Sequence, residues 1–170
     1  MSWLLTFGFA AAIVSATAPG DPPGIGDTAP SLPQQAVRPL TGASTQAPIT
    51  VVEFFATWCA ACQASLRDTV NVLNALDPGQ GSHFKLMIVD VGEDEAVVQT
   101  WLSEAALFRT TAITLDRDRR AYARWGADRL PTIFVLDSGG IIRHINRGHG
   151  KGYRARLTMW LRKRMAEALP

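Results

Sequence analysis

One stretch constrains the fold more than any other: a strand-like run that is followed at once by two closely spaced cysteines and a helix-like pattern. Residues 49–55 read Ile-Thr-Val-Val-Glu-Phe-Phe, a β-branched and aromatic run typical of a strand buried on both faces. Cys59 and Cys62 come next, and from Ala60 to Leu76 apolar residues recur at helical spacing. A buried strand that passes directly into a helix predicts an α/β fold with both cysteines at the turn.

The rest of the chain continues the alternation of strands and helices. Further strands are expected at residues 84–91, 112–115, 132–136 and 141–146, and further helices at residues 94–107, 117–125 and 153–169. Ser138-Gly139-Gly140 predicts a hairpin turn before the last strand. The pattern predicts a central sheet with helices on both faces, to which the final hairpin adds antiparallel strands.

The chain of 170 residues is long enough for one domain with a substantial core. We expect a signal peptide or membrane tether at residues 1–18, a linker and lead-in segment at residues 19–48, and the folded domain at residues 49–170. The lead-in segment is rich in Pro, Gly, Ser, Thr and Gln.

The first residues predict export from the cytoplasm. Trp3 to Val14 is an apolar run, and Val14-Ser15-Ala16 fits the small-x-small pattern of a signal-peptidase site. The run is too short for a comfortable transmembrane helix, and no Lys or Arg precedes it. The expected location is periplasmic or secreted, with an N-terminal anchor if the signal is retained; an N-terminus without structure is the alternative.

Only two cysteines are present, and their spacing favours chemistry over cross-linking. Cys59 would lie at the helix N-terminus, where free N–H groups and the helix dipole favour a thiolate. Cys62 lies one turn further and faces inward, so Cys59 is expected to be the nucleophile and Cys62 the resolving thiol. A structural disulfide and a zinc site are the alternatives, although none of the histidines has ligand spacing to the pair.

Several segments together resemble the thioredoxin superfamily. The run Val52-Glu-Phe-Phe-Ala-Thr-Trp-Cys-Ala-Ala-Cys62 resembles its active-site segment, and Leu130-Pro131-Thr132 resembles its cis-proline loop. Gly26-Asp-Thr-Ala-Pro30 and residues 108–125 resemble the lead-in motif and the central insert of the TlpA/ResA-like periplasmic branch. The resemblance implies a thioredoxin-like fold: a central mixed sheet flanked by helices, with an N-terminal extension and a central strand–helix insert.

The resemblance also implies roles for individual residues. Trp58 would shield the thiols and, together with Leu130, Pro131 and Thr132, would bind the substrate. Pro131 would be in the cis form, and its loop would face an extended substrate segment. Glu53 would be a buried acid with a raised pKa that accepts the proton of Cys62. An ordinary trans proline, and a Glu53 that reaches solvent or pairs with a cation, are the alternatives.

Two departures from the family pattern limit what the resemblance implies. Ala60-Ala61 stands between the cysteines, where relatives usually have proline in the second place, so the redox potential stays open. Thr132 follows Pro131 in place of glutamate, so the cytochrome-c-maturation pattern is missing.

The function implied is that of a thiol–disulfide oxidoreductase, a reductant of protein disulfides outside the cytoplasm. It would need no dissociable cofactor and no metal, take electrons from an unidentified donor and act as a monomer. A copper-binding or apo-cytochrome-binding module on the same fold is the alternative, and a peroxidase fits poorly. The net charge of +2 gives no reason to expect nucleic-acid binding.

The basic C-terminal stretch has two interpretations. From Arg143 to Arg164 there are eight Lys or Arg residues and no acidic residue. The helix expected at residues 153–169 could lie on an anionic membrane, but packing its apolar stripe on the sheet is the favoured reading.

Overall fold

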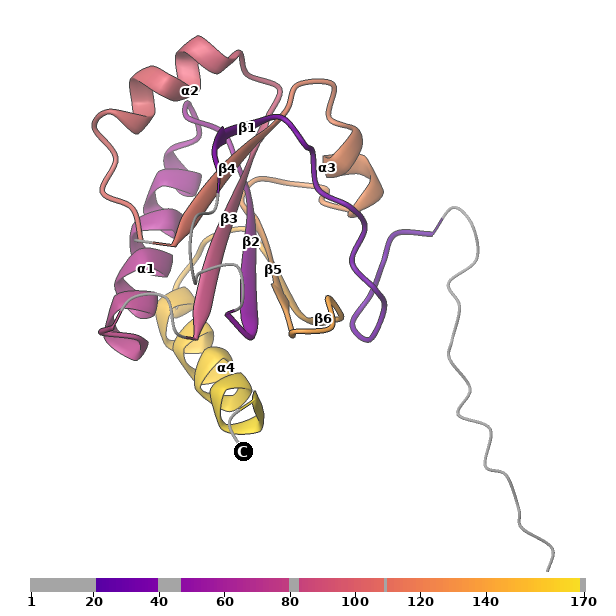
Figure 1. Cartoon of the computed structure of the whole chain (residues 1–170), viewed down its shortest axis with the longest axis vertical. Coiled ribbons are helices and arrows are strands. Elements are labelled where there is room, and N and C mark those ends of the chain that lie inside the picture. The colour runs from indigo at the N-terminus through magenta and orange to yellow at the C-terminus, as the bar shows by residue number, and fades with distance from the viewer. Residues whose placement is uncertain (1–20, 40–46, 80–82, 109, 169–170) are drawn as a thin grey trace, which may run out of the picture.

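The computed structural model describes residues 21–39, 47–79, 83–108 and 110–168, which form one mixed sheet with helices against it (Figure 1). The strands are β1 (Ala36–Arg38), β2 (Ile49–Phe55), β3 (Phe84–Val91), β4 (Thr111–Asp116), β5 (Thr132–Leu136) and β6 (Ile142–Arg147). The helices are α1 (Ala60–Leu76), α2 (Glu95–Leu102), α3 (Arg120–Arg124) and α4 (Tyr153–Ala168).

The strand order is β1-β4-β3-β2-β5-β6, which places β2 inside the sheet. β2 pairs with β3 in parallel and with β5 in antiparallel orientation, and all seven of its residues are buried. A strand with neighbours on both edges and helices on both faces must be apolar throughout, which explains the unbroken run at residues 49–55.

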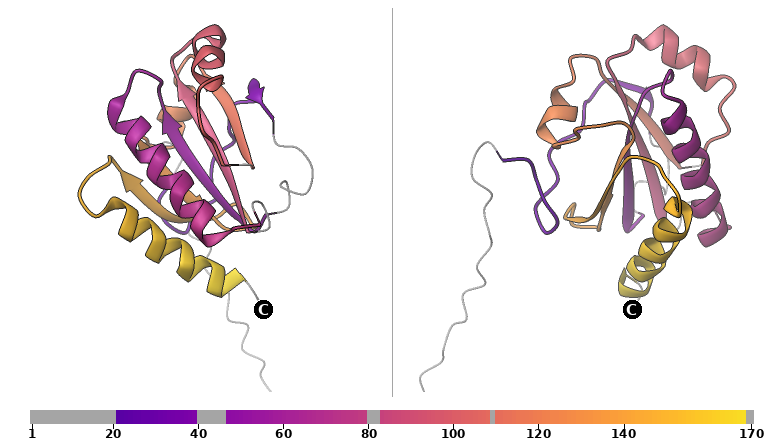
Figure 2. Two further views of the ribbon diagram at one scale, coloured as in Figure 1. Left: turned by 90° about the vertical axis from the view of Figure 1, so that its left-hand side faces the viewer. Right: turned by 180° about the vertical axis from the view of Figure 1, so that it is seen from behind.

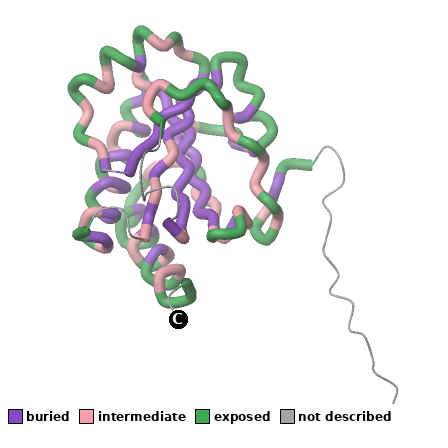
Figure 3. Tube along the Cα trace, in the orientation of Figure 1, coloured by how far each residue is buried: buried purple, intermediate pink, exposed green. Residues whose placement is uncertain are grey.

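The two faces of the sheet carry separate cores, because side chains alternate along β2. Val51 and Phe55 face α1 and α4, whereas Val52 and Phe54 face α3 and the N-terminal segment. α1 and α4 lie side by side on their face, as Figure 2 shows. Figure 3 shows that the buried residues follow the strands, while the outer surfaces of the helices are exposed. Glu53 is the exception to this apolar pattern, because its odd-numbered position points a carboxyl group into the α1–α4 face.

The predicted elements are largely confirmed. The bounds of β2, α1, β3 and β5 are those expected from the sequence, and β4, β6 and α4 agree within about two residues over their described parts.

Two predicted helices are shorter than expected. α2 ends at Leu102, not at residue 107: Ser103 is its C-cap residue, and the chain beyond it buries Phe108. α3 begins at Arg120, not at residue 117, because Arg119 has a left-handed backbone (φ 58°) that no helix interior accepts.

β1 was not expected from the sequence. It pairs antiparallel with β4 and forms an edge of the sheet, and Thr28 makes a further bridge to Ile141 at the opposite edge. The segment before residue 49 therefore contacts both edges of the sheet. The division of the chain at residue 49 stays a prediction, and the expected signal or tether at residues 1–18 lies outside the described residues. No helix in the described part of the chain is long and apolar enough to span a membrane.

Candidate active site

The two cysteines lie at the turn from β2 into α1. Cys59 is the N-cap residue of α1, with an extended backbone, and its Sγ accepts a hydrogen bond from the Cys62 N–H at 3.1 Å. The two residues form a disulfide, with their Cα atoms 5.2 Å apart. Cys59 is 8% exposed and Cys62 is completely buried. The two sulfurs are therefore inequivalent: one borders the surface at a helix N-terminus, and the other lies inside.

Glu53 is a fully buried acid on the same face of the sheet. Its carboxylate oxygens have no hydrogen-bond partner within bonding distance among the described groups, although the Ser65 and Thr69 hydroxyls lie near enough to act on it. Burial raises the pKa of Glu53 to about 8, and the two hydroxyls lower it only in part. The side chain thus lies inside, away from solvent and without an ion pair among the described residues, and it carries the raised pKa that the resemblance implies.

α1 connects Glu53 to the cysteines. Cys62, Ser65 and Thr69 are three and four residues apart, so they form one stripe along the buried face of the helix. Ser65 has no hydrogen-bond partner for its buried hydroxyl, and Thr69 shares a hydrogen bond of 2.8 Å with the Tyr153 hydroxyl of α4. Ser65 therefore lies between the resolving cysteine and Thr69 on this stripe, and the Ser65 and Thr69 hydroxyls both act on Glu53.

A second acidic group supports the turn, and sequence reasoning missed it. Glu93, in the loop between β3 and α2, accepts hydrogen bonds from the Thr57 backbone N–H at 2.5 Å and the Thr57 hydroxyl at 2.7 Å. Burial raises the pKa of the nearby Asp90, and the Glu93 carboxyl raises it further. An acid at the buried end of an apolar strand, here Asp90 in β3, is the signal that could have drawn attention to this pair.

A groove of about 310 Å³ opens beside Cys59. Its lining residues come from four separate segments: Trp58, Cys59, Val91, Arg119, Tyr122 and Leu130. Trp58 is 69% exposed, so it forms a wall of this groove without being buried over the sulfurs. The expected substrate-contacting residues Trp58 and Leu130 are thus brought together with the outer cysteine.

The Leu130–Pro131 peptide bond is cis, as the resemblance predicts. Its loop is held by hydrogen bonds on both sides: the Gly148 N–H donates to the Pro131 carbonyl at 2.7 Å, and the Thr132 hydroxyl donates to the Arg129 carbonyl at 2.6 Å. Gly148 has φ 80°, which explains why glycine stands there. Thr132 is completely buried, so its side chain holds the loop from within and does not line the groove.

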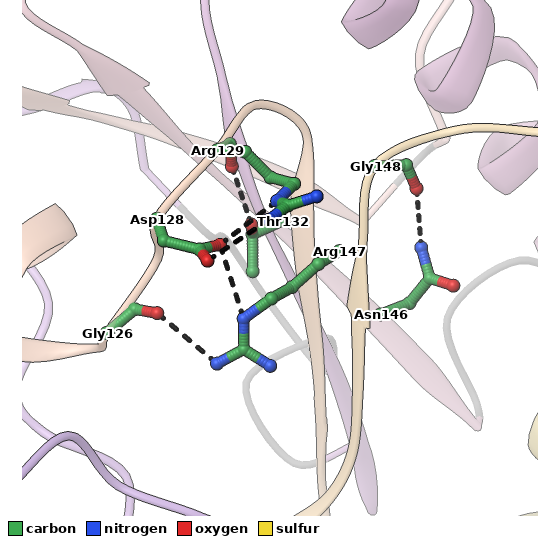
Figure 4. Close-up of polar contacts among 7 residues, drawn as sticks. All are labelled: Gly126, Asp128, Arg129, Thr132, Asn146, Arg147 and Gly148. Atoms are coloured by element: carbon green, nitrogen blue, oxygen red, sulfur yellow. Dashed lines mark hydrogen bonds and ion pairs between the residues drawn. The ribbon is translucent and has the colours of Figure 1, made fainter.

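Figure 4 shows a second layer of contacts around this loop. Arg147 of β6 forms an ion pair with Asp128 at 3.4 Å and donates to the Gly126 carbonyl at 3.3 Å. Asn146 donates through its side-chain amide to the Gly148 carbonyl at 2.7 Å. The last strand therefore fixes the segment that carries Leu130 and Pro131.

The described residues offer no obvious metal site. Within them, no group of three or more His, Cys, Asp or Glu side chains is arranged to hold an ion. The histidines have other contacts: His83 lies 3.6 Å from Asp77, His144 stacks on Trp160, and His149 lies 3.0 Å from Asp68.

A buried strand that runs into a cysteine-capped helix, opposite a cis-proline loop, defines the thioredoxin-like class of proteins. The chain belongs to the AhpC/TSA family, whose sequence profile matches residues 25–145. This match begins in the segment before residue 49, in agreement with the contacts of that segment with the sheet.

Curated relatives agree with the expected branch. The chain is 29% identical over 97 residues to a protein of Geobacillus thermodenitrificans named thiol-disulfide oxidoreductase ResA. The aligned residues make up 57% of this chain and 53% of that protein. A protein of Geobacillus kaustophilus with the same name is 28% identical over the same extent. The chain thus spans about half the length of the curated relatives that it matches. The resemblance to the ResA-like branch is confirmed.

A solved structure confirms the thioredoxin-like fold. A Chlorobium tepidum protein that carries the name thiol:disulfide interchange protein DsbE superimposes with a TM-score of 0.66, at 20% identity, over 82% of this chain and 96% of that one.

Proposed function

We propose that this protein is a thiol–disulfide oxidoreductase that reduces protein disulfides outside the cytoplasm. The observation that carries the proposal is the inequivalence of the two sulfurs: Cys59 caps a helix beside a groove, while Cys62 is buried above a stripe that leads to Glu53. The names of the curated relatives support the same activity.

In the first step the Cys59 thiolate attacks one sulfur of a substrate disulfide. The substrate S–S bond breaks, a mixed disulfide with Cys59 forms, and the second substrate sulfur leaves as a thiolate that takes a proton from water. The helix N-terminus stabilises the Cys59 thiolate through its N–H groups, of which that of Cys62 already points at Sγ. Leu130 and Pro131 hold the substrate segment along the groove.

In the second step Cys62 loses its proton and attacks the mixed disulfide. The Cys59–Cys62 disulfide forms, and the substrate leaves with both of its sulfurs reduced. Glu53 accepts the Cys62 proton in its ionised form, which is the minor form below a pH of about 8. A carboxyl whose pKa lies close to that of a thiol exchanges protons with it readily. Since Ser65 lies one turn beyond Cys62 on α1 and its hydroxyl acts on Glu53, the proton passes through the Ser65 hydroxyl or a water molecule.

The first experiment is the reduction potential of the Cys59–Cys62 pair, measured by equilibrating the full chain in thiol buffers. We expect a value near about −270 mV, typical of thioredoxin-like reductants. A value of about −120 mV would mean that the protein is an oxidant and not a reductant, and we would attribute this to the Ala60-Ala61 dipeptide. Failure of the pair to form a disulfide would refute the activity and favour the copper-binding alternative.

Mixed-disulfide trapping separates the two cysteines. Cys62→Ser should accumulate a stable mixed disulfide with a model substrate, whereas Cys59→Ser should form none. Glu53→Gln should slow resolution at neutral pH while leaving the first attack nearly unchanged. Equal slowing of both steps would remove the role assigned to Glu53.

Location and assembly are part of the proposal. The apolar run at residues 3–14 supports export, and cell fractionation of the tagged chain would test it; recovery in the cytoplasm would contradict it. Size-exclusion chromatography tests the expected monomer.

A further inference from the structure

The groove beside Cys59 is lined by apolar side chains and by one cation. Trp58, Val91 and Leu130 supply apolar surface next to the outer sulfur, and Arg119 and Tyr122 bring polar groups from the segment that follows β4. None of the residues that line this groove is acidic. Any peptide that reaches Cys59 through the groove therefore meets a positive charge.

The backbone holds Arg119 in an unusual conformation. Among the described residues it is the only non-glycine residue with positive φ, at 58°. Such a conformation costs about 1–3 kcal/mol for a residue with a side chain. Glycine would be the relaxed choice at this position, so the presence of arginine indicates that its side chain has a use.

Gly92 leaves room for the guanidinium group. A Cβ atom at Gly92 would lie 2.9 Å from Nε and 3.2 Å from Nη2 of Arg119. The absence of a side chain at Gly92 thus lets the cation lie against the loop that follows β3, next to the groove residue Val91.

The charge of Arg119 is not neutralised by a carboxylate of the described residues. Its neighbours are paired: Arg117 lies 3.8 Å from Asp94, and Arg120 lies 2.8 Å from Asp118. Within the described part of the chain, the Arg119 side chain forms no ion pair and no side-chain hydrogen bond. The cation that lines the groove is therefore available to a ligand.

We propose that Arg119 forms a subsite for an acidic side chain, so that the preferred substrates carry Asp or Glu close to the cysteine that Cys59 attacks. This inference rests on the proposed disulfide-exchange activity and adds a substrate class to it. Arg119 is a specificity-determining residue: the exchange at sulfur is unchanged, and the ion pair raises the population of correctly placed substrate.

The test uses three peptides that differ in one residue beside a cysteine held in a mixed disulfide with 2-mercaptoethanol. That residue is Glu, Gln or Lys. The rate of the first attack by the reduced full chain is measured for each peptide. The wild type should react with the Glu peptide about fivefold faster than with the Lys peptide, as expected for a partly exposed ion pair, and 0.5 M NaCl should reduce this ratio.

Variants at residue 119 test whether Arg119 causes the preference for the Glu peptide. Arg119→Gln and Arg119→Gly should bring the Glu/Lys ratio close to one, and Arg119→Lys should retain most of it. Arg119→Gly also relieves the backbone strain, so a loss of preference in this variant cannot come from misfolding of the turn. Arg120→Gln is the matched control, since it removes the adjacent, paired arginine, and it should keep the wild-type ratio.

The outcomes separate this inference from the proposed function. Equal rates for all three peptides would overturn the acidic subsite while leaving disulfide exchange intact. An unchanged ratio in Arg119→Gln and Arg119→Gly would overturn it as well. Failure to react with any peptide, or with the neutral disulfide of 2-mercaptoethanol, would overturn both proposals.

Discussion

Glu53 is the residue at which sequence and environment conflict most strongly. It stands in the middle of an otherwise buried apolar and β-branched strand, and nothing within bonding distance satisfies its oxygens among the described groups. An ionised carboxylate would be costly there, so the folded protein favours the protonated acid up to a pH of about 8. The raised pKa brings the proton affinity of Glu53 close to that of a neighbouring thiol, and burying the carboxyl costs the fold stability.

The stability of the oxidised protein should therefore depend on pH through Glu53. Its pKa rises from 4.5 to about 8 on folding, so the folded state holds a proton that the unfolded state loses in between. The free energy of unfolding should fall as pH rises through this window, by about 1.4 kcal/mol per unit from this group. Glu53→Gln should remove that contribution, as measured by urea unfolding at pH 5, 6, 7 and 8.

Asp90 provides the internal control for this measurement. Its pKa is also raised by burial, so part of the slope should remain in Glu53→Gln. An unchanged slope in Glu53→Gln would mean that Glu53 titrates normally in the folded state.

At the scale of elements, loops from different parts of the chain hold the cysteine turn. Glu93, after β3, bonds both the backbone and the side chain of Thr57, two residues before Cys59. The Gly148 N–H, after β6, holds the Pro131 loop. The site thus depends on contacts between loops at one end of the sheet, in addition to the strand–helix unit that carries the cysteines.

Glu93→Ala should loosen the cysteine turn. It leaves the Thr57 N–H and hydroxyl without their acceptor, which should cost about 1–3 kcal/mol of unfolding free energy. The variant should also lower the pKa of Asp90 by removing the adjacent carboxyl. Glu104→Ala, at an exposed position, is the control and should change stability little. Equal stability of the two variants would show that the Glu93 contacts contribute nothing.

Asp116→Ala should destabilise α3. The buried Asp116 carboxylate accepts hydrogen bonds from the Ala121 N–H at 3.0 Å and the Tyr122 N–H at 2.7 Å, which otherwise lack acceptors at the helix start. We expect a loss of about 1–2 kcal/mol in unfolding free energy. Asp116→Asn, which keeps one acceptor oxygen, should lose less; a larger loss for Asn than for Ala would contradict this capping role.

At the scale of the whole molecule, the N-terminal segment joins elements that the sheet alone does not connect. The Gly26 N–H donates to the Ile142 carbonyl at 2.8 Å, and β1 pairs with β4 at the other edge. The segment also lies against Gly126, because a Cβ atom there would be 2.3 Å from Cβ of Pro22. This contact ties the segment to the loop that leads into Leu130 and Pro131.

Gly126→Ala should weaken the contact between the N-terminal segment and the loop at residue 126. Gly140→Ala is the matched control. Both glycines have positive φ, but only Gly126 has a neighbour within 4 Å of the added Cβ. Gly140→Ala should cost about 1 kcal/mol through backbone strain, and Gly126→Ala should cost clearly more. Limited proteolysis should also cut Gly126→Ala faster within residues 21–39. Equal costs in the two variants would mean that Pro22 moves aside freely.

Local sequence was sufficient to predict the elements whose own side chains determine their burial. The run at residues 49–55 is apolar along nearly its whole length, and α1 carries an apolar stripe of its own, so both were predicted with their correct bounds. Cys59 and Cys62 could be predicted as a pair for the same reason, because their relation depends only on the turn between these two elements. Local patterns failed for β1, which is a strand because the distant β4 offers it an unpaired edge. They also gave no sign of the left-handed backbone of Arg119, which delays the start of α3.

The sequence alone determined the strand, the helix and the cysteine pair, because hydrophobic periodicity and residue spacing are local properties that tertiary contacts only reinforce. Tertiary structure decided which side chains surround that pair. Glu93 reaches Thr57 across 36 positions of sequence, Arg119 lines a groove with Cys59, and the edge strands are chosen by the pairing of separate segments. These contacts depend on how the elements pack, and packing is a property of the whole chain that no single window of sequence contains.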